Sequence, residues 1–483
     1  MTSGRPHQRR RPDGPARRSA QRPSERSRRA DPARQAAFET LRAVDAEDAY
    51  ANLVLPGLLR DRHIGGRDAA FATELAYGTL RVRARYDAVL GACVDRPLES
   101  LDAGVLDALR LGAHQLLGMR VPPHAAVGET VALVRQNLGG GPSSLVNAVL
   151  RRVSERDIEQ WLEQVAPDAS TDPLGHLAVA ESHPLWVVRS LREALAGHGG
   201  LVRPLDDELR ELLAADNRPP EVTLVARPGL VTPDELTRAG GSPGRWSPVA
   251  VRLASGDPGR IAAVRDGRAG VQDEGSQLVA LALAAADVGS PDQRWLDLCA
   301  GPGGKSGLLG ALARERGGRL VAVEQAAHRA DLVRTSVRAL GDTVEVRCTD
   351  GREVGRAEPS SFDRVLVDAP CTGLGALRRR PESRWRRQPA DVAALAPLQR
   401  ELLTSGIDAV RPGGVVAYVT CSPHRAETTL VVDDVVRRRA DVELVDARPL
   451  LAGVPDVGGG PTVQLWPHRH ATDAMFLALM RRR

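Results

Sequence analysis

The sequence predicts an α/β protein whose C-terminal part is a parallel, doubly wound sheet, preceded by an all-helical domain and a small α/β subdomain. Two observations support this prediction. From about residue 269 onward, short apolar, β-branched runs alternate with helical segments, whereas over 35–154 apolar residues recur only at helical spacing. The length of 483 residues also exceeds what one hydrophobic core ordinarily serves, so several domains are expected.

The N-terminal segment 1–34 is predicted to be a disordered basic tail. It carries eleven arginines and three acidic residues, a net charge of +8, while the whole chain has a formal net charge of +5. Because it holds almost no large apolar side chain, it cannot bury enough surface to offset the entropy lost on ordering. It either follows the phosphates of a nucleic acid or is a solvated extension without a specific role; both interpretations stay open.

The composition excludes several classes of protein. No stretch approaches the roughly 18 uncharged apolar residues of a membrane span, and the basic N-terminus is not followed by the apolar core of a signal peptide. Five cysteines without repeated close spacing form neither a disulfide framework nor a zinc knuckle. We therefore expect a cytoplasmic protein that does not contact a membrane and whose cysteines are reduced.

Three regions precede the predicted sheet. The all-helical domain over 35–154 contains patterns such as AFETLRAV, and none of its polar pairs has catalytic spacing, so a scaffold or docking role is the default. Residues 155–215 are predicted to be a helical connector. The small α/β subdomain over 216–268 is predicted from a strand, a turn and a helix within PPEVTLVARPGLVTPDELTRAG.

The last domain, 269–483, follows an alternating pattern. Strands are predicted over 294–299, 319–324, 344–348, 363–370 and 413–421, and two late runs, 442–447 and 473–480, complete the edge. Helices are predicted over 276–286, 306–315 and 328–340, with a longer one before the fifth strand. In such sheets ligands bind beyond the carboxyl ends of the strands, where the strand order reverses.

A glycine-rich turn, AGPGGKS, follows the first strand of this sheet, which is expected to end at Cys299. Glycine at 301, 303 and 304 allows close approach of a ligand to the backbone. A phosphate-binding P-loop would need glycine at position 299, and a dinucleotide fingerprint would need its third glycine at Ser306. The turn alone is therefore a weak signal.

Acidic residues follow the next three strands. Glu324 is placed to accept hydrogen bonds from ribose hydroxyls, Asp350 to hold an adenine amino group, and Asp368 to face a positive centre. Each of these, taken alone, is more often a helix cap or a solvated carboxylate. Three acids at successive strand ends favour a ligand with a ribose, an amino-bearing base and a positive charge, which S-adenosylmethionine combines.

Two cysteines, Cys371 in DAPC and Cys421 in TCS, lie at or just beyond the ends of the fourth and fifth strands. If these strands are neighbours, both thiols project into the ligand crevice. The other candidates, Cys93 and Cys348, are expected to be buried structural residues. Activation of a thiol needs positive surroundings, for which the sequence offers His424, Arg425, Lys305 and the arginines of 375–385. Such a thiolate can add to carbon 6 of a pyrimidine and make carbon 5 nucleophilic enough to accept a methyl group.

These motifs carry a resemblance to a known family. DLCAGPGGKS, VLVDAPCTGLGALRRRPESRW and VTCS occur in the order found in RNA 5-methylcytosine methyltransferases. The region AFETLRAV to LVNAVLRRV resembles the NusB-like RNA-binding domain of the 16S ribosomal RNA methyltransferase B group. The resemblance covers nearly everything after residue 35, and implies a Rossmann-like methyltransferase domain preceded by an all-helical NusB-like domain.

The resemblance also implies which residues do the chemistry. The S-adenosylmethionine site would comprise Cys299, Ala300, Gly301, Pro302, Gly303, Gly304, Lys305, Glu324, Asp350 and Asp368. Cys421 would attack carbon 6, Cys371 would assist release, and Asp368 would hydrogen-bond ring nitrogen 3 or the exocyclic amine. The closing motif WPHRHATDAMF has alanine at 471 and 474 where the family pattern predicts glycine.

Lys305 is the only lysine of the chain. A compact ammonium fits a crowded turn more easily than a planar guanidinium, so we expect Lys305 to hydrogen-bond backbone carbonyls or a carboxylate such as Asp368. Retention of one lysine by chance in an arginine-rich composition is the alternative. The pair His468 and His470 lacks a third ligand and is expected to face solvent or contact phosphate, so no metal is predicted.

The sequence thus predicts an S-adenosylmethionine-dependent cytosine-5 methyltransferase that binds RNA, with 16S ribosomal RNA as substrate and a monomer as the state. Transfer RNA is the alternative substrate. A non-catalytic RNA-binding assembly or transcription factor is the alternative from the binding class, although the intact turn and both cysteines argue against it. A nicotinamide-dependent oxidoreductase would leave the paired cysteines unexplained.

Overall fold

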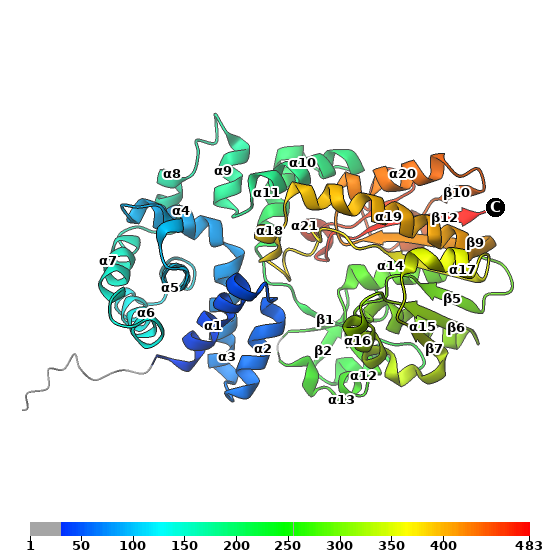
Figure 1. Cartoon of the computed structure of the whole chain (residues 1–483), viewed down its shortest axis with the longest axis horizontal. Coiled ribbons are helices and arrows are strands. Elements are labelled where there is room, and N and C mark those ends of the chain that lie inside the picture. The colour runs from blue at the N-terminus through cyan, green and yellow to red at the C-terminus, as the bar shows by residue number, and fades with distance from the viewer. Residues whose placement is uncertain (1–29, 255) are drawn as a thin grey trace, which may run out of the picture.

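The computed structural model describes residues 30–254 and 256–483 (Figure 1). Residues 1–29, which hold most of the predicted disordered tail, lie outside the described residues. The last part of that segment is helical, because the first helix begins at Pro32 and is capped by Asp31, whose side chain accepts a hydrogen bond from the backbone of Arg34. Among the described residues, no helix combines the length and the apolar character that crossing a membrane requires.

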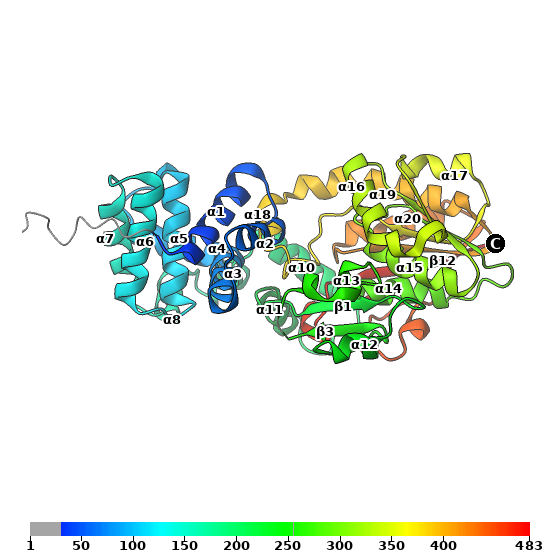
Figure 2. The same ribbon diagram turned by 90° about the horizontal axis from the view of Figure 1, so that it is seen from below.

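The N-terminal region is all-helical, as predicted. Its helices are α1 (Pro32–Glu47), α2 (Ala51–Asp61), α3 (Gly66–Arg81), α4 (Arg83–Cys93), α5 (Ala103–Leu117), α6 (Pro123–Leu138), α7 (Ser143–Val153) and α8 (Ile158–Val165). Leucines that recur at helical spacing, such as Leu75, Leu109 and Leu150, are fully buried in one shared core. This bundle stands at one end of the elongated molecule (Figure 2).

The segment predicted as a connector does more than connect. It continues with α9 (Pro173–Ala180), α10 (Leu185–His198) and α11 (Leu205–Asp216). Leu191 of α10 and Leu212 of α11 are buried in one cluster with Leu377 and Trp466 of the C-terminal domain. Helices α10 and α11 therefore help to hold two loops of that domain in place.

The small subdomain contains a four-stranded antiparallel sheet in the order β2-β3-β1-β4, of which the sequence predicted one strand. Its strands are β1 (Val222–Ala226), β2 (Gly241–Pro243), β3 (Ala250–Leu253) and β4 (Ala269–Val271). The predicted helix is α12 (Pro233–Arg238), which starts with a capping box between Thr232 and Glu235, and a short α13 (Ala262–Arg265) follows. The three other strands were missed because they are only three or four residues long.

The C-terminal domain contains an eight-stranded sheet in the order β10-β12-β9-β8-β5-β6-β7, with β11 paired to β12. Its strands are β5 (Arg294–Asp297), β6 (Arg319–Val323), β7 (Val344–Arg347), β8 (Phe362–Asp368), β9 (Val410–Thr420), β10 (Val442–Val445), β11 (Val463–Gln464) and β12 (Phe476–Arg482). Strands β5 to β9 pair in parallel, and β12 runs antiparallel to β9 and β10. The predicted doubly wound α/β fold is thereby confirmed.

Helices cover both faces of this sheet (Figure 1). The helices of this domain are α14 (Glu274–Ala285), α15 (Gly304–Glu315), α16 (Ala327–Val337), α17 (Val354–Ala357), α18 (Ser383–Arg386), α19 (Pro389–Ala409), α20 (Thr429–Arg437) and α21 (Pro467–His470). The short helix α18 lies away from the sheet, beside the helical bundle. Successive residues of β5 serve opposite cores: Trp295 is buried with α14 and α15, and Leu296 with α19. The chain runs from β5 outward to β7 and then returns to β8 on the other side of β5, so the order reverses beside β5.

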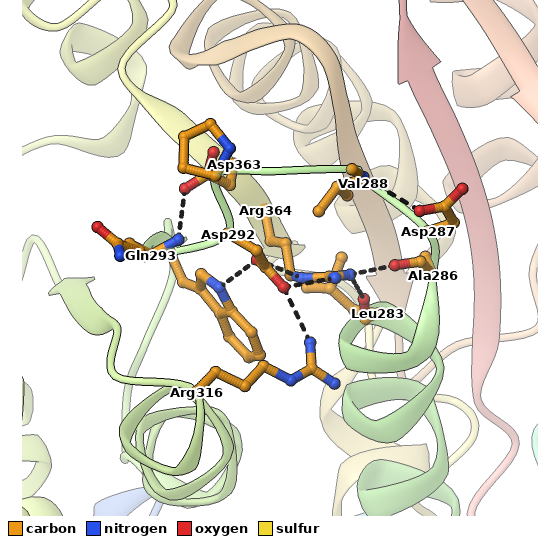
Figure 3. A network of polar contacts seen from close by, with 12 residues as sticks. Leu283, Ala286, Asp287, Val288, Asp292, Gln293, Arg316, Asp363 and Arg364 are labelled. Carbon is orange, nitrogen blue, oxygen red and sulfur yellow. Dashed lines mark hydrogen bonds and ion pairs between the residues drawn. The ribbon is translucent and has the colours of Figure 1, made fainter.

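The amino-terminal edge of the sheet is fixed by arginine and carboxylate contacts (Figure 3). Asp363 accepts hydrogen bonds from the backbone of Gln293 and Arg294, both at 2.8 Å, and from Arg411. Arg364 pairs with Asp292 and donates to the carbonyl groups of Leu283 and Ala286 at the end of α14. These contacts leave the opposite, carboxyl edge of the strands as the place for a ligand.

Candidate active site

The glycine-rich turn lies between β5 and α15. Strand β5 ends at Asp297, two residues before the predicted end at Cys299. Gly303 has a φ of 105°, which favours glycine, and a Cβ there would lie 2.7 Å from the Cβ of Ser336. A Cβ on Gly301 would lie 2.2 Å from Glu324, whose carboxylate accepts the Gly301 backbone N–H at 3.1 Å. The fold therefore leaves no room for a side chain at either glycine.

Lys305 spans the site, as the sequence analysis expected. Its ammonium donates a 2.8 Å hydrogen bond to the carboxylate of Asp368, the last residue of β8. Burial lowers the pKa of Lys305, but the Asp368 carboxylate more than offsets this, so the pKa is raised overall. The ammonium therefore stays charged and joins the turn to the end of the neighbouring strand.

Cys371 and Cys421 meet beyond the ends of β8 and β9. These strands are parallel neighbours with Asp368 opposite Val419, and the two sulfur atoms are 3.5 Å apart. The hydrogen bond between the thiols lowers the pKa of Cys421, against burial and the Asp368 charge, and Lys305 lowers it further. The same hydrogen bond, together with burial, raises the pKa of Cys371 well above its ordinary value. Of the two thiols, Cys421 is therefore the one that loses its proton more readily.

The positive surroundings of Cys421 are only in part those predicted. Lys305 contributes, and so does Arg379, since the thiolate raises the pKa of that guanidinium. Burial lowers the pKa of His424, which disfavours the charged form of this imidazole. Arg384, predicted in the same cluster, is buried elsewhere: it donates to the carbonyl oxygens of Arg81 and Ser182, both at 2.9 Å.

The closing motif forms one wall of the site. Asp473 is fully buried, pairs with Arg379, and donates its backbone N–H to Asp273 at 3.0 Å. Ala471 adopts a left-handed conformation with a φ of 57°, where the family pattern has glycine. Ala474, at the other such position, is only 1% exposed and its methyl group packs in the core shared with α10 and α11.

Three predictions about polar residues were wrong. His468 does not face solvent: its Nε2 lies 2.5 Å from the carboxylate of Glu208, and only 3% of its side chain is exposed. His470 is also buried, with Nε2 near the carbonyl oxygen of Pro455. Cys348 is exposed, not buried, whereas Cys93 is buried as predicted. In the described part of the chain, no group of three potential metal ligands occurs.

Two buried acids at the site were missed by the sequence analysis. Asp297 accepts a 2.6 Å hydrogen bond from Ser306, and burial raises its pKa to about 7. Glu427, two residues before α20, accepts hydrogen bonds from the residues that follow both cysteines. The available signal was an acid within a few residues of each motif, which sequence alone does not distinguish from a solvated carboxylate.

The site fits the cofactor that the resemblance implies. Acidic side chains stand just beyond β6 and β7 and at the last residue of β8, as a ligand with a ribose, an amino-bearing base and a positive centre requires. Glu324 and Asp368 adjoin the turn, and Asp350 lies after β7, where Arg352 holds its carboxylate. At Gly304 a Cβ would meet only Gln272, at 3.8 Å, so the turn has space on that side.

Comparisons with known proteins agree with this arrangement. Residues 284–481 match the family described as 16S rRNA methyltransferase RsmB/F, and residues 31–155 match the NusB family. Rv1407 of Mycobacterium tuberculosis, provisionally named a methyltransferase, is 57% identical and covers 95% of this chain and 98% of its own length. Ribosomal RNA small subunit methyltransferase B of Pseudomonas syringae pv. tomato is 33% identical, and the match covers 88% of this chain and 91% of that protein. The crystal structure of PH0851 has a TM-score of 0.76 at 21% identity, covering 93% and 98% of the two chains, and so has the same fold.

Fold, turn and comparisons together define the class: the protein is an S-adenosylmethionine-dependent RNA methyltransferase. Within that class, the extent of the match to the methyltransferase B sequences is decisive. The chain belongs to the RsmB/F family of 16S rRNA methyltransferases, in the form that carries an N-terminal NusB domain.

Proposed function

We propose that this enzyme methylates carbon 5 of a cytidine in 16S ribosomal RNA through a covalent adduct with Cys421. The observation that carries the proposal is the 3.5 Å contact between the sulfurs of Cys421 and Cys371, beside the ion pair of Lys305 and Asp368. A single nucleophile needs no such partner. A thiolate and a thiol at one place suit a reaction in which one sulfur bonds to the base and a second group takes part in its release.

The chain's own residues support each step. The Cys421 thiolate adds to carbon 6 of the pyrimidine, and carbon 5 becomes nucleophilic. Asp368, whose second carboxylate oxygen is free of the Lys305 contact, hydrogen-bonds ring nitrogen 3 or the exocyclic amine and stabilises the adduct. Cys371 assists removal of the proton from carbon 5, after which the bond between carbon 6 and sulfur breaks and Cys421 is released.

The cofactor supplies the methyl group when it is bound. We propose that the residues of the turn from Cys299 to Lys305 hold it, together with Glu324, Asp350 and Asp368. Glu324 would accept from the ribose hydroxyls and Asp350 from the adenine amino group. Support comes from the position of all three acids at one edge of the sheet, beside a turn whose glycines 301 and 303 have no room for a Cβ.

The helical N-terminal domain and the small antiparallel subdomain would position the RNA, mainly through phosphate contacts, while the target base is turned out of its stack. The match of residues 31–155 to the NusB family supports the first part of this proposal. We further propose that the enzyme acts as a monomer in the cytoplasm, where ribosomal RNA is processed.

The test compares wild type and Cys421→Ala on RNA from cells that lack the protein. With labelled S-adenosylmethionine, wild type is expected to label 16S RNA, and mass spectrometry should locate 5-methylcytidine in it. Cys421→Ala should bind cofactor in a filter assay without transferring label. Methyl transfer by Cys421→Ala would refute the mechanism. Label found only in transfer RNA would identify transfer RNA, not 16S RNA, as the substrate. If wild type binds the cofactor but transfers no label, a non-catalytic RNA-binding role is favoured.

A further inference from the structure

Glu427 is a buried carboxylate placed between the two cysteine loops. Glu427 is 0% exposed and lies six positions after Cys421. Among the described residues, no arginine or lysine lies within ion-pair distance of it. A buried carboxylate without a cation is expensive, and here only hydrogen bonds offset its desolvation. Such a group calls for an explanation beyond ordinary packing.

The donors to Glu427 come from both cysteine loops. Thr372, directly after Cys371, donates its backbone N–H at 2.7 Å and its hydroxyl at 2.5 Å. Ser422, directly after Cys421, donates its hydroxyl at 2.6 Å. The two loops are fifty residues apart in sequence. They also contact each other directly, because the hydroxyl groups of Thr372 and Ser422 lie 3.3 Å apart and the backbone N–H of Gly375 donates to the carbonyl of Cys421 at 2.9 Å. Glu427 adds to these contacts a carboxylate that accepts from both loops at once.

A third element completes the contact. Gln399 of α19 donates from one amide nitrogen to Glu427 at 3.3 Å and to the carbonyl oxygen of Pro370 at 2.9 Å. The Tyr418 hydroxyl, within β9, donates to the backbone carbonyl of Glu427 at 2.8 Å. Glu427 is thus held through its side chain by the long helix α19 and through its backbone by strand β9, while its carboxylate holds the two loops.

We propose that Glu427 is a positioning residue that sets the separation and direction of the Cys371 and Cys421 sulfurs. Displacement of one loop by a fraction of an ångström would weaken the thiol–thiol hydrogen bond, because its strength depends steeply on geometry. The consequence for the thiol geometry stands by itself, whereas the consequence for methyl transfer rests on the proposed function.

The first experiment measures the thiol geometry without any RNA. A trivalent aryl arsenoxide bridges two neighbouring thiols: two sulfur–arsenic bonds form, and the oxide oxygen leaves as water with both thiol protons. Wild type should chelate phenylarsine oxide tightly, and Cys371→Ala should bind it only weakly through one thiol. Glu427→Ala is expected to move the affinity at least tenfold toward that of Cys371→Ala.

The second experiment uses activity. In Glu427→Ala, kcat for methyl transfer should fall by about a hundredfold, the loss typical of reacting groups displaced by about 1 Å, while KM for RNA and cofactor binding stay near wild type. Glu427→Gln keeps the chain length and one acceptor oxygen for Thr372, so it should recover most of the arsenical affinity and of kcat. Recovery by Gln separates positioning from a need for negative charge.

The matched control is Asp363→Ala. Asp363 is also a buried carboxylate that holds two segments, but it lies at the opposite, amino-terminal edge of the sheet (Figure 3). The Asp363→Ala variant should have a lower melting temperature than wild type but the same arsenical affinity. If Glu427→Ala does not fold, Thr372→Val and Ser422→Ala remove single hydroxyl donors and should each weaken arsenical binding, with Thr40→Val, which loses only an intrahelical bond, as their control.

The outcomes are distinct. Wild-type arsenical affinity in folded Glu427→Ala, or in both single-donor variants, overturns the proposal. If Glu427→Ala loses arsenical affinity but keeps its kcat, the positioning role of Glu427 is supported. The proposed catalytic role of the cysteine pair is then contradicted instead.

Discussion

The ammonium of Lys305 lies 2.8 Å from the carboxylate of Asp368 and thereby joins the turn after β5 to the carboxyl end of β8. This is the point at which the strand order reverses. The same ammonium lowers the pKa of Cys421, so one residue links the cofactor turn, the last residue of a central strand and the proposed nucleophile.

Replacing Lys305 by methionine should shift the pH dependence of methyl transfer. The thiolate is the reactive form, and loss of the ammonium removes an influence that lowers the pKa of Cys421. Its pKa therefore rises, and the acidic limb of kcat/KM against pH should move to higher pH. Lys305→Arg keeps the charge but not the shape, so it should leave the limb in place and reduce cofactor affinity and turnover. An unchanged profile in Lys305→Met, or full activity in Lys305→Arg, would contradict this account.

Cys371→Ala should trap the enzyme on its RNA. Adduct formation needs only Cys421, whereas release uses Cys371, so a covalent protein–RNA band should accumulate on denaturing electrophoresis. Because the hydrogen bond with Cys371 lowers the pKa of Cys421, its loss should also make the adduct form more slowly at neutral pH than at about pH 8.5. The double variant Cys371→Ala, Cys421→Ala should show no band. Normal turnover by Cys371→Ala would remove the release role.

Arg384→Met should destabilise the contact between the helical bundle and the catalytic domain. Arg384 is fully buried and donates to Arg81, Ser182 and Asn217 of the preceding regions. Loss of these bonds leaves buried acceptors unpaired, and we expect a cost of about 2–4 kcal/mol in the free energy of unfolding. Arg380→Met, at an exposed neighbour that lies over Tyr50, should cost less than about 1 kcal/mol. Denaturant titration measures both, and equal costs would contradict the assignment.

The two alanines of the closing motif should respond oppositely to glycine. Ala471 has a φ of 57°, so Ala471→Gly removes left-handed strain and should stabilise by about 0.5–1 kcal/mol. Ala474 is buried without that conformation, so Ala474→Gly loses a packed methyl group and should destabilise by about 1–2 kcal/mol. If the melting temperatures of Ala471→Gly and Ala474→Gly shift in the same direction, the proposed difference between the two positions is refuted.

Asp297 should make stability depend on pH. Burial raises its pKa from 3.8 to about 7, so the folded state binds this proton more tightly than the unfolded state does. Its contribution is present in full below pH 3.8 and is lost as the pH rises toward 7. The stability of wild type relative to Asp297→Asn should therefore decline between about pH 4 and pH 7. A constant difference across that range in denaturant titrations would show that Asp297 does not titrate there.

The order of elements in the C-terminal domain was predictable because it depends on local pattern. Apolar runs of period two, helical spacing and a glycine-rich turn act within about twenty residues, and they placed Cys371 and Cys421 beyond two strand ends. Their meeting required those strands to be neighbours, which the strand order confirms. Lys305 was predictable for a similar reason, since a unique residue type in a constrained turn narrows its possible partners.

Sequence by itself determined the kinds of groups present and their distance from strand ends. Only the tertiary structure decided what each polar side chain faces, because that depends on segments far apart in the chain. His468 contacts the buried carboxylate of Glu208 and not solvent, and Arg384 donates to the helical bundle and does not lie at the cysteines. Glu427 is buried between two loops. A buried charge is stable only where donors converge on it, and that convergence comes from packing, not from the neighbouring residues of the chain.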